Sequence, residues 1–360
     1  MQSPVEIISS FYHKINRKLL LCFSTAIICG FLTHFYMLVN KLPNWDDINN
    51  FGGPGVSSLY GRWFLDVLHP LSGTWSNPWL NGSVAIILLA FVCCILYMVL
   101  ELKTSASAII LPAIMMTFPS VASTMCFMFT VDLYACGLIF ACLGVYVLRK
   151  YKYGCVLSFI LFLLCLGTYQ CYICFSIALL VFGLIMDLLN GKDVKSVFLS
   201  GIKSAATLLV TIIVYLPMSR AINPNMTQEA QNGIGNMASN MTPAVLIKQA
   251  LRTFKRMFEY FISKPYSYVS DTVHMTNILI CILIAGLFLW LFIRKGMHRN
   301  LQTAFLYVLC LFLLPVSLAF FYVMSPEANY STLMYYQYAL VYLFLLVLLE
   351  KFAAECSANT

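Results

Sequence analysis

Two adjacent carboxylates, Asp46 and Asp47, stand in a polar stretch at residues 41–82 that lies between two strongly apolar runs. A carboxylate within hydrogen-bond reach of a hydroxyl group can act as a general base by accepting its proton. The same pair, in the sequence Asn44-Trp-Asp-Asp, also suits the start of a short helix, where Asp and Asn side chains cap free backbone N–H groups. Both roles stay open, because one carboxylate can cap while the other faces a cavity.

The same stretch holds Arg62 and four of the five tryptophans of the chain, which are Trp45, Trp63, Trp75 and Trp79. A guanidinium group binds a phosphate or a carboxylate through two parallel hydrogen bonds, and the adjacent indole of Trp63 offers a flat surface for a sugar. Trp and Arg are also common anchors at membrane–water interfaces. Arg62 and Trp63 are therefore candidates for substrate contact, with interfacial anchoring as the alternative.

Further polar residues fall next to apolar runs: Asp132, in the sequence Phe129-Thr-Val-Asp-Leu-Tyr134, and the pair Tyr169-Gln170. An ionisable residue at a membrane span is costly unless it faces a partner or a water-filled cavity, which makes function the first hypothesis for Asp132. Tyr169 and Gln170 lie at a junction between two runs, where a plain turn would serve as well. No glycine-rich phosphate loop, metal-spaced histidine cluster or Ser-His-Asp set is evident, and we expect no metal ligands.

The elements that must position these residues are transmembrane helices. The chain of 360 residues is 61% hydrophobic and only 10% charged, with a mean hydropathy of +0.84. A soluble core of this size cannot hide so much apolar surface from water. The 14 cysteines lie mostly inside apolar runs and indicate small hydrophobic side chains rather than disulfides or zinc ligands. The net charge of +8 is not gathered in a soluble patch, which argues against a nucleic-acid partner.

Apolar runs of about 17 to 25 residues, the length that an α-helix needs to cross the hydrocarbon layer, recur along the chain. They predict an all-α polytopic membrane protein that forms a single domain over residues 1–360. Two long polar loops, at 41–82 and 219–275, interrupt the runs. We expect about ten spans, at residues 19–39, 83–100, 105–119, 125–148, 154–168, 171–188, 199–218, 276–293, 302–323 and 333–350.

The distribution of basic residues predicts the orientation. If the N-terminus is inside, fourteen of the 22 Lys and Arg residues fall on the cytoplasmic side, and the other eight all fall in the two long loops. The positive-inside rule therefore predicts a cytoplasmic N-terminus and places both long loops on the extracytoplasmic face. The candidate residues described above then share that face. Glu101, Asp187 and Asp193 fall at the cytoplasmic ends of spans and suit ordinary solvated charges.

The second long loop is predicted to be irregular over residues 223–240 and helical from Pro243 onward. Apolar residues fall on one face of this helix, at Leu246, Ala250, Phe254, Met257 and Phe261, and basic residues lie mainly on the others, at Lys248, Arg252, Lys255 and Arg256. A basic amphipathic helix of this kind usually lies in the membrane interface, with its apolar face toward the lipid. Alternatively, Arg252 and Arg256 form a basic wall that faces a phosphate-bearing lipid substrate.

The order of these motifs resembles the Gtr type II glucosyltransferases, which belong with the polytopic, lipid-linked sugar transferases of the GT-C type. The similarity rests on the Asp-Asp pair after the first span, Gly61-Arg62-Trp63, the Phe-x-x-Asp-x-Tyr sequence that contains Asp132, and Tyr169-Gln170. It covers the chain from about Leu42 to the last span.

The resemblance implies a multi-pass enzyme of the bacterial inner membrane. Such an enzyme moves a hexose, typically glucose, from a polyprenyl-phosphate-linked donor to a cell-surface glycan acceptor, such as O-antigen or a wall polymer, on the extracytoplasmic face. The resemblance gives the role of base to Asp46 or Asp47 and contact with phosphate or sugar to Arg62. Asp132, Tyr169 and Gln170 would line the site. No cofactor is indicated, although a divalent cation could stabilise the leaving phosphate.

A transporter or flippase of lipid-linked glycans is the main alternative, and a non-catalytic membrane scaffold is the third. A transporter is expected to carry charges along a path at mid-membrane and paired internal repeats. In this chain the candidate charges gather at one face and no repeat is apparent. The pattern therefore favours the transferase.

Overall fold

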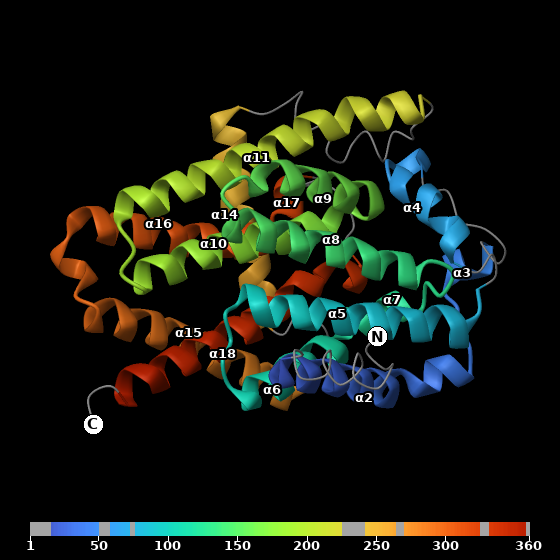
Figure 1. Ribbon diagram of the computed structural model, residues 1–360, viewed down its shortest axis with the longest axis horizontal. Helices are drawn as coiled ribbons and strands as arrows, with labels where there is room; N and C mark the ends of the chain where they lie inside the picture. Colours follow the sequence, from blue (N-terminus) through green and yellow to red (C-terminus); the bar gives the residue numbers. More distant parts are fainter. Residues whose placement is uncertain are drawn as a thin grey trace, which may run out of the picture.

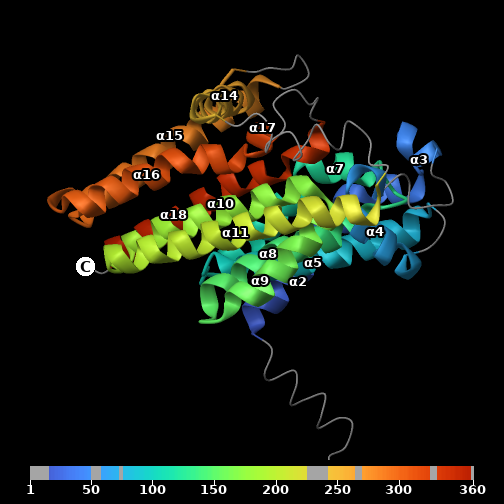
Figure 2. The same cartoon turned by 90° about the horizontal axis from the view of Figure 1, so that it is seen from above.

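The computed structural model describes residues 16–49, 58–72, 76–224, 242–263, 270–324 and 331–357. Every regular element in these ranges is helical, and the long helices run side by side (Figures 1 and 2). The expected class, an all-α polytopic membrane protein, is confirmed. All 14 cysteines are free and most are buried or half-buried among apolar side chains.

Seven helical segments of the described chain are long and apolar enough to cross a membrane. They are α2 (Arg17–Val39), α5 (Ser83–Val99) with the π-helical turn η3 (Pro78–Gly82) before it, α8 (Val131–Lys150), α10 (Ile173–Leu189) with the 3-10 turn η4 (Gln170–Tyr172) before it, α11 (Val194–Ile222), α15 (Asp271–Arg294) and α16 (Leu301–Leu318).

The other three expected spans are helical but irregular. At residues 105–119 the chain forms α6 (Ser105–Thr117) and then α7 (Pro119–Met125), bent by 49° at Phe118, and this pair makes an eighth span if it is counted as one. At 154–168 it forms α9 (Gly154–Thr168), whose 15 residues extend only about 22 Å. At 333–350 it forms the 3-10 helix η7 (Thr332–Tyr338) and then α18 (Ala339–Ser357). In the described chain, seven or eight segments therefore have span-like length and composition, compared with the ten expected.

Side chains at the helix starts explain several of the observed boundaries. Asn16, Thr104, Asp193, Ser270 and Asn300 each accept a hydrogen bond from a backbone N–H in the first turn of the helix that follows. These N–H groups have no partner inside the helix, so a capping oxygen favours a start at that point.

The helices α8 and α10 form the centre of the bundle, where most of their residues are buried, whereas α2 and α15 lie at its periphery. The centre is packed closely enough to require small residues. A side chain at Gly144 of α8 would place its Cβ 2.4 Å from the Phe162 ring of α9, and Ser158 Oγ donates a hydrogen bond to the Gly144 carbonyl (2.8 Å). Gly144 therefore sets the distance between α8 and α9.

The first loop forms a cap on one end of the bundle, beside the N-terminus of α8 and at the right of Figure 1. It contains the short elements α3 (Trp45–Asn49), η1 (Ser58–Tyr60), α4 (Trp63–Leu68) and η2 (His69–Leu71). The C-terminal ends of α8 and α10, the start of α11 and the chain's C-terminus lie toward the opposite end (Figure 1).

The expected helix in the second loop is confirmed as α14 (Pro243–Phe261), which packs against α15, α16 and the short α17 (Phe321–Met324). Its C-terminal half contacts the bundle: Phe254 lies 4.8 Å from Phe312 between ring centroids, and Phe261 is buried. Leu246, in its N-terminal half, is exposed. Most of the region that was expected to be irregular, residues 225–240, lies outside the described ranges.

We expect Gly144→Val to lower the free energy of unfolding by about 1–3 kcal/mol, because the new side chain would overlap the buried Phe162 ring. The same substitution at Gly286, in α15, is the matched control, since a Cβ there meets no atom within 4 Å. Thermal unfolding of both variants in the same detergent measures the difference. Equal stability of the two variants would contradict the proposed role of Gly144 in the spacing of α8 and α9.

Candidate active site

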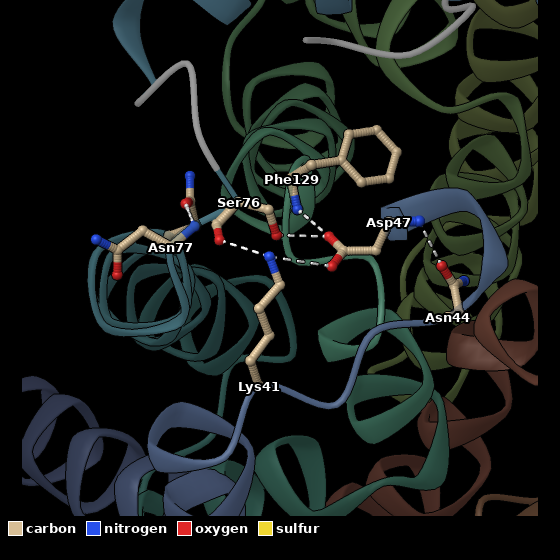
Figure 3. Close-up of polar contacts among 7 residues, drawn as sticks. Lys41, Asn44, Asp47, Ser76, Asn77 and Phe129 are labelled. Carbon is tan, nitrogen blue, oxygen red and sulfur yellow. Dashed lines mark hydrogen bonds and ion pairs between the residues drawn. The ribbon is translucent and has the colours of Figure 1, made fainter. Parts of the chain in front are cut away.

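Asp47 lies fully buried in the centre of the first loop (Figure 3). Its Oδ1 accepts hydrogen bonds from Ser76 Oγ (2.6 Å) and from the backbone N–H of Phe129 (2.9 Å). Its Oδ2 faces Lys41 Nζ at 3.6 Å, and Lys41 also donates to the Ser76 carbonyl (2.8 Å). Asp47 therefore joins both ends of the first loop to the turn before α8.

Asp46, its neighbour in α3, is exposed. The helix is capped by Asn44, whose Oδ1 accepts the backbone N–H of Asp47 (2.8 Å), so neither aspartate is needed as the cap. Successive residues of an α-helix point about 100° apart. Because the Asp47 side chain points into the protein, the Asp46 side chain points toward the surface.

The sequence Phe129-Thr-Val-Asp132-Leu-Tyr134 holds the first loop at three points. The Phe129 N–H binds Asp47, and Asp132 Oδ2 accepts from Ser72 Oγ (2.6 Å) and Asn81 Nδ2 (3.3 Å). The Tyr134 hydroxyl accepts a hydrogen bond from Arg62 Nη1 (3.0 Å). Asp132 is thus a buried anchor in the first turn of α8, where the positive end of the helix dipole favours a carboxylate.

Arg62 lies among aromatic rings. Its guanidinium carbon is 4.8 Å from the ring centroid of Tyr169 and 5.8 Å from that of Tyr60. Such stacking stabilises a cation on an aromatic face. Trp63, the next residue, begins α4 and packs against Gly167 of α9, where a Cβ would lie 2.7 Å from the indole. The absence of a side chain at Gly167 therefore lets α4 lie directly on α9.

Gln170 fixes the turn that presents Arg62. Its Nε2 donates to the Tyr60 carbonyl (2.6 Å) and to the Tyr215 hydroxyl (2.9 Å). The Tyr215 hydroxyl in turn donates to the Gly61 carbonyl (2.9 Å). Gly61 adopts a φ of 76°, in the left-handed region that glycine enters without strain. Tyr169 and Gln170 therefore do more than form a turn, because they hold the Arg62 backbone and side chain.

Several buried polar atoms around this assembly have no hydrogen-bond partner among the described residues. They are Arg62 Nε, Trp63 Nε1, Thr130 Oγ1 and the Tyr169 hydroxyl, whereas Asp47 Oδ2, which also lacks a hydrogen bond, faces Lys41 Nζ at 3.6 Å. Buried polar groups in folded proteins are nearly always paired, and a local concentration of exceptions calls for a ligand or ordered water. Two of these atoms are N–H donors on adjacent residues, an arrangement that suits an acceptor-rich group such as a phosphate or a sugar.

Arg252 and Arg256 do not join this assembly. Arg256 lies on α14, where its guanidinium carbon is 5.6 Å from the Tyr322 ring centroid and its Nη1 pairs with Glu259 (3.0 Å). Arg252 is half-buried on the same helix. Figures 1 and 2 both show α14 well separated from α3 and α4. The structure thus brings together Asp46, Asp47, Arg62, Trp63, Asp132, Tyr169 and Gln170, without the two arginines of the second loop.

Several residues of the assembly were not singled out in the sequence, namely Lys41, Ser72, Ser76, Asn81 and Tyr215. Most are neutral polar residues, whose types do not distinguish a hydrogen-bonding role from a solvated loop. Asn81 could have been identified from its position, because it lies two residues before an expected apolar span. Trp75 lies outside the described residues. In the described parts of the chain, His, Cys, Asp and Glu form no group of three that could hold a metal ion.

We expect Asp47→Ala to destabilise the protein by about 2–4 kcal/mol, because it removes a buried carboxylate that accepts two hydrogen bonds and faces a lysine. Asp66→Ala, which removes an exposed carboxylate of the same loop, is the control and should change stability by less than about 1 kcal/mol. Thermal unfolding in detergent reports both effects. An unchanged midpoint for Asp47→Ala would show that Asp47 does not anchor the first loop.

Comparison with known proteins gives a family match that covers most of the chain. The family described as glucosyl transferase GtrII matches residues 35–348, a range that contains the whole assembly around Asp47 and Arg62. Neither the curated proteins nor the solved structures give a match. The match agrees with the resemblance drawn from the motifs of the first loop and of α8. The chain belongs to the glucosyl transferase GtrII family.

Proposed function

We propose that this glycosyltransferase moves glucose from a polyprenyl-phosphate-linked donor to a cell-surface glycan such as O-antigen. The family supports glucosyl transfer, and the lipid-linked donor follows from the motif resemblance. The observation that carries the assignment of the site is the set of unpaired buried donors on Arg62 and Trp63, at the same end of the bundle as an exposed carboxylate. The reaction requires hydrogen-bond donors that bind the substrate and a carboxylate that accepts a proton.

Asp46 is the proposed general base. A base must reach the acceptor hydroxyl, and the exposed Asp46 carboxylate is accessible whereas Asp47 is fully buried. Asp47 acts as a positioning residue, because its bonds to Ser76 and Phe129 fix the orientation of α3. Asp46 takes the proton of the acceptor hydroxyl while the oxygen of that hydroxyl attacks the anomeric carbon of the glucose. The bond between the anomeric carbon and the phosphate oxygen breaks, and the polyprenyl phosphate leaves. A single displacement of this kind inverts the configuration at that carbon.

Arg62 is the proposed contact to the leaving phosphate. The polyprenyl phosphate departs as a stable anion, so the reaction needs a counter-charge rather than a strong acid. Arg62 is fixed by Tyr134, Tyr169 and the turn at Gly61, while its Nε has no hydrogen-bond partner among the described residues. Trp63 Nε1 would donate to the sugar or to the same phosphate. Asp132, Tyr169 and Gln170 line and shape the site.

The proposed setting is the bacterial inner membrane, with a cytoplasmic N-terminus and the first loop on the extracytoplasmic face. The excess of basic residues on the side of the N-terminus supports this orientation. Residues 1–360 are proposed to act as one domain. Arg252 and Arg256, which lie away from the first loop, are proposed to contact anionic lipid at the membrane surface through α14.

We expect Asp46→Asn to reduce glucose transfer by about 10²- to 10⁴-fold, because the amide cannot accept the acceptor proton. Thermal stability should stay close to that of the unaltered protein, since Asp46 is exposed. The measurement is transfer of labelled glucose from polyprenyl-phosphate glucose to the acceptor glycan in membranes. Asp66→Asn, at another exposed carboxylate of the same loop, is the control and should retain activity. Full activity of Asp46→Asn at normal expression would exclude Asp46 as the base.

Arg62→Lys is expected to lower kcat/KM for the lipid-linked donor by at least about tenfold while the charge is retained. Lysine has no planar fork to stack on Tyr169 and bind a phosphate at the same time. Arg220→Lys, at a basic residue near the end of α11, is the control. Kinetics with the donor varied at fixed acceptor separate a defect in donor binding from one in acceptor binding. A change confined to the acceptor KM would argue against contact between Arg62 and the phosphate.

A further inference from the structure

The end of the bundle opposite the first loop contains a cavity of about 660 Å³. Its walls come from the start of α2, the end of α5 and the following turn, the end of α8, the end of α10 and the start of α11. The cavity is thus formed by four separate stretches of the chain. It shares no residue with the site around Asp47 and Arg62.

The walls of this cavity carry an excess of positive charge. Four lining residues are basic, Lys103, Arg149, Lys150 and Lys192, and two are acidic, Glu101 and Asp187. Apolar side chains, among them Leu19, Val99 and Val197, form the rest of the lining together with neutral polar groups. A cavity of this composition suits a ligand that has both an anionic part and an apolar part.

Three of the lining residues form a charge cluster of one carboxylate and two basic side chains. Asp187 is buried, contrary to the solvated position expected from the sequence. Its Oδ1 accepts a hydrogen bond from Arg149 Nη2 (3.1 Å) and forms an ion pair with Lys192 Nζ (2.9 Å). Arg149 lies against Gly183, where a Cβ would come within 1.9 Å of its Nη1, so the glycine provides the space for the guanidinium. Two basic side chains are thereby held in place by a single carboxylate.

The charge cluster leaves hydrogen-bond donors of its basic residues unused. A guanidinium has five N–H donors, and among the described residues the Arg149 side chain makes one hydrogen bond, to Asp187. Lys192 is more than half exposed, and Lys150 is exposed above the Tyr146 ring, 4.8 Å from its centroid. Asp187 and Glu101 offset only two of the four basic charges, so the lining keeps a net positive charge.

We propose that this cavity binds the phosphate-bearing headgroup of an anionic phospholipid. Basic pockets between transmembrane helices at the level of the headgroups are suited to such lipids. The apolar lining and the adjoining apolar helices α2 and α11 offer surface to the acyl chains. The proposed lipid is a ligand separate from the sugar donor and acceptor, and its binding does not depend on the proposed transferase mechanism.

The test compares retention of phosphatidylglycerol and phosphatidylcholine of equal chain length by the purified full-length protein, measured by native mass spectrometry. Lys150→Gln with Lys192→Gln should weaken retention of phosphatidylglycerol by at least about tenfold, since each basic residue near a headgroup contributes substantially to binding. Lys152→Gln with Arg299→Gln removes the same charge from exposed residues that do not line the cavity, and should leave retention nearly unchanged.

A second variant keeps the charge and fills the space. Ser196→Trp, at an exposed residue of the cavity wall, should also lower retention of phosphatidylglycerol. Equal losses in the pocket and control variants, or no loss in either pocket variant, would overturn the proposal. Equal retention of the two lipids by the unaltered protein would overturn it too. Complete displacement of phosphatidylglycerol by inorganic phosphate would assign the cavity to a free anion and not to a lipid.

Discussion

The attachment of the first loop to the N-terminal end of α8 is the interaction on which the proposed site depends. One short segment forms hydrogen bonds with three separate parts of the loop. It does so through the Phe129 N–H, the Asp132 carboxylate and the Tyr134 hydroxyl. A loop of this length has a large conformational entropy when it is free. Buried bonds to charged groups offset that entropy, since each is stronger than a bond between neutral groups.

This attachment also explains why two adjacent aspartates differ in burial. Asp47 is directed inward by Ser76, Lys41 and the Phe129 N–H, and the helical turn of α3 then directs Asp46 outward. A buried carboxylate with its donors in place is suited to hold structure, because moving it exposes or unpairs several groups at once. An exposed carboxylate on a fixed helix is suited to proton transfer. In the proposed mechanism, the positioning role and the proton transfer thus fall to two adjacent residues.

Hydropathy was enough to locate the helices, because each span must satisfy its own backbone hydrogen bonds in lipid. It missed the bend at Phe118 and the 3-10 segment at Thr332–Tyr338, which depend on contacts between helices as well as on length. Ser120 Oγ, for example, donates to the Thr332 carbonyl (2.6 Å), a contact between residues far apart in the chain. The assignment of Asp47 required Phe129, which lies 82 residues further along. Spacing along a sequence carries no information about such pairs, and it could not show that α14 keeps Arg256 away from the first loop.

Charged residues lie at both ends of α8, where the helix dipole acts on them. Its N-terminus is partly positive and faces the Asp132 carboxylate, whereas its partly negative C-terminus carries Arg149 and Lys150 in the last turn. Both ends are therefore stabilised by charges of the sign that the dipole favours. Because α8 is also packed against α9 through Gly144 and against α5 and α10, it cannot shift along its axis without disturbing both ends. The same rigid helix therefore fixes the position of Tyr134, and with it Arg62, relative to the rest of the bundle.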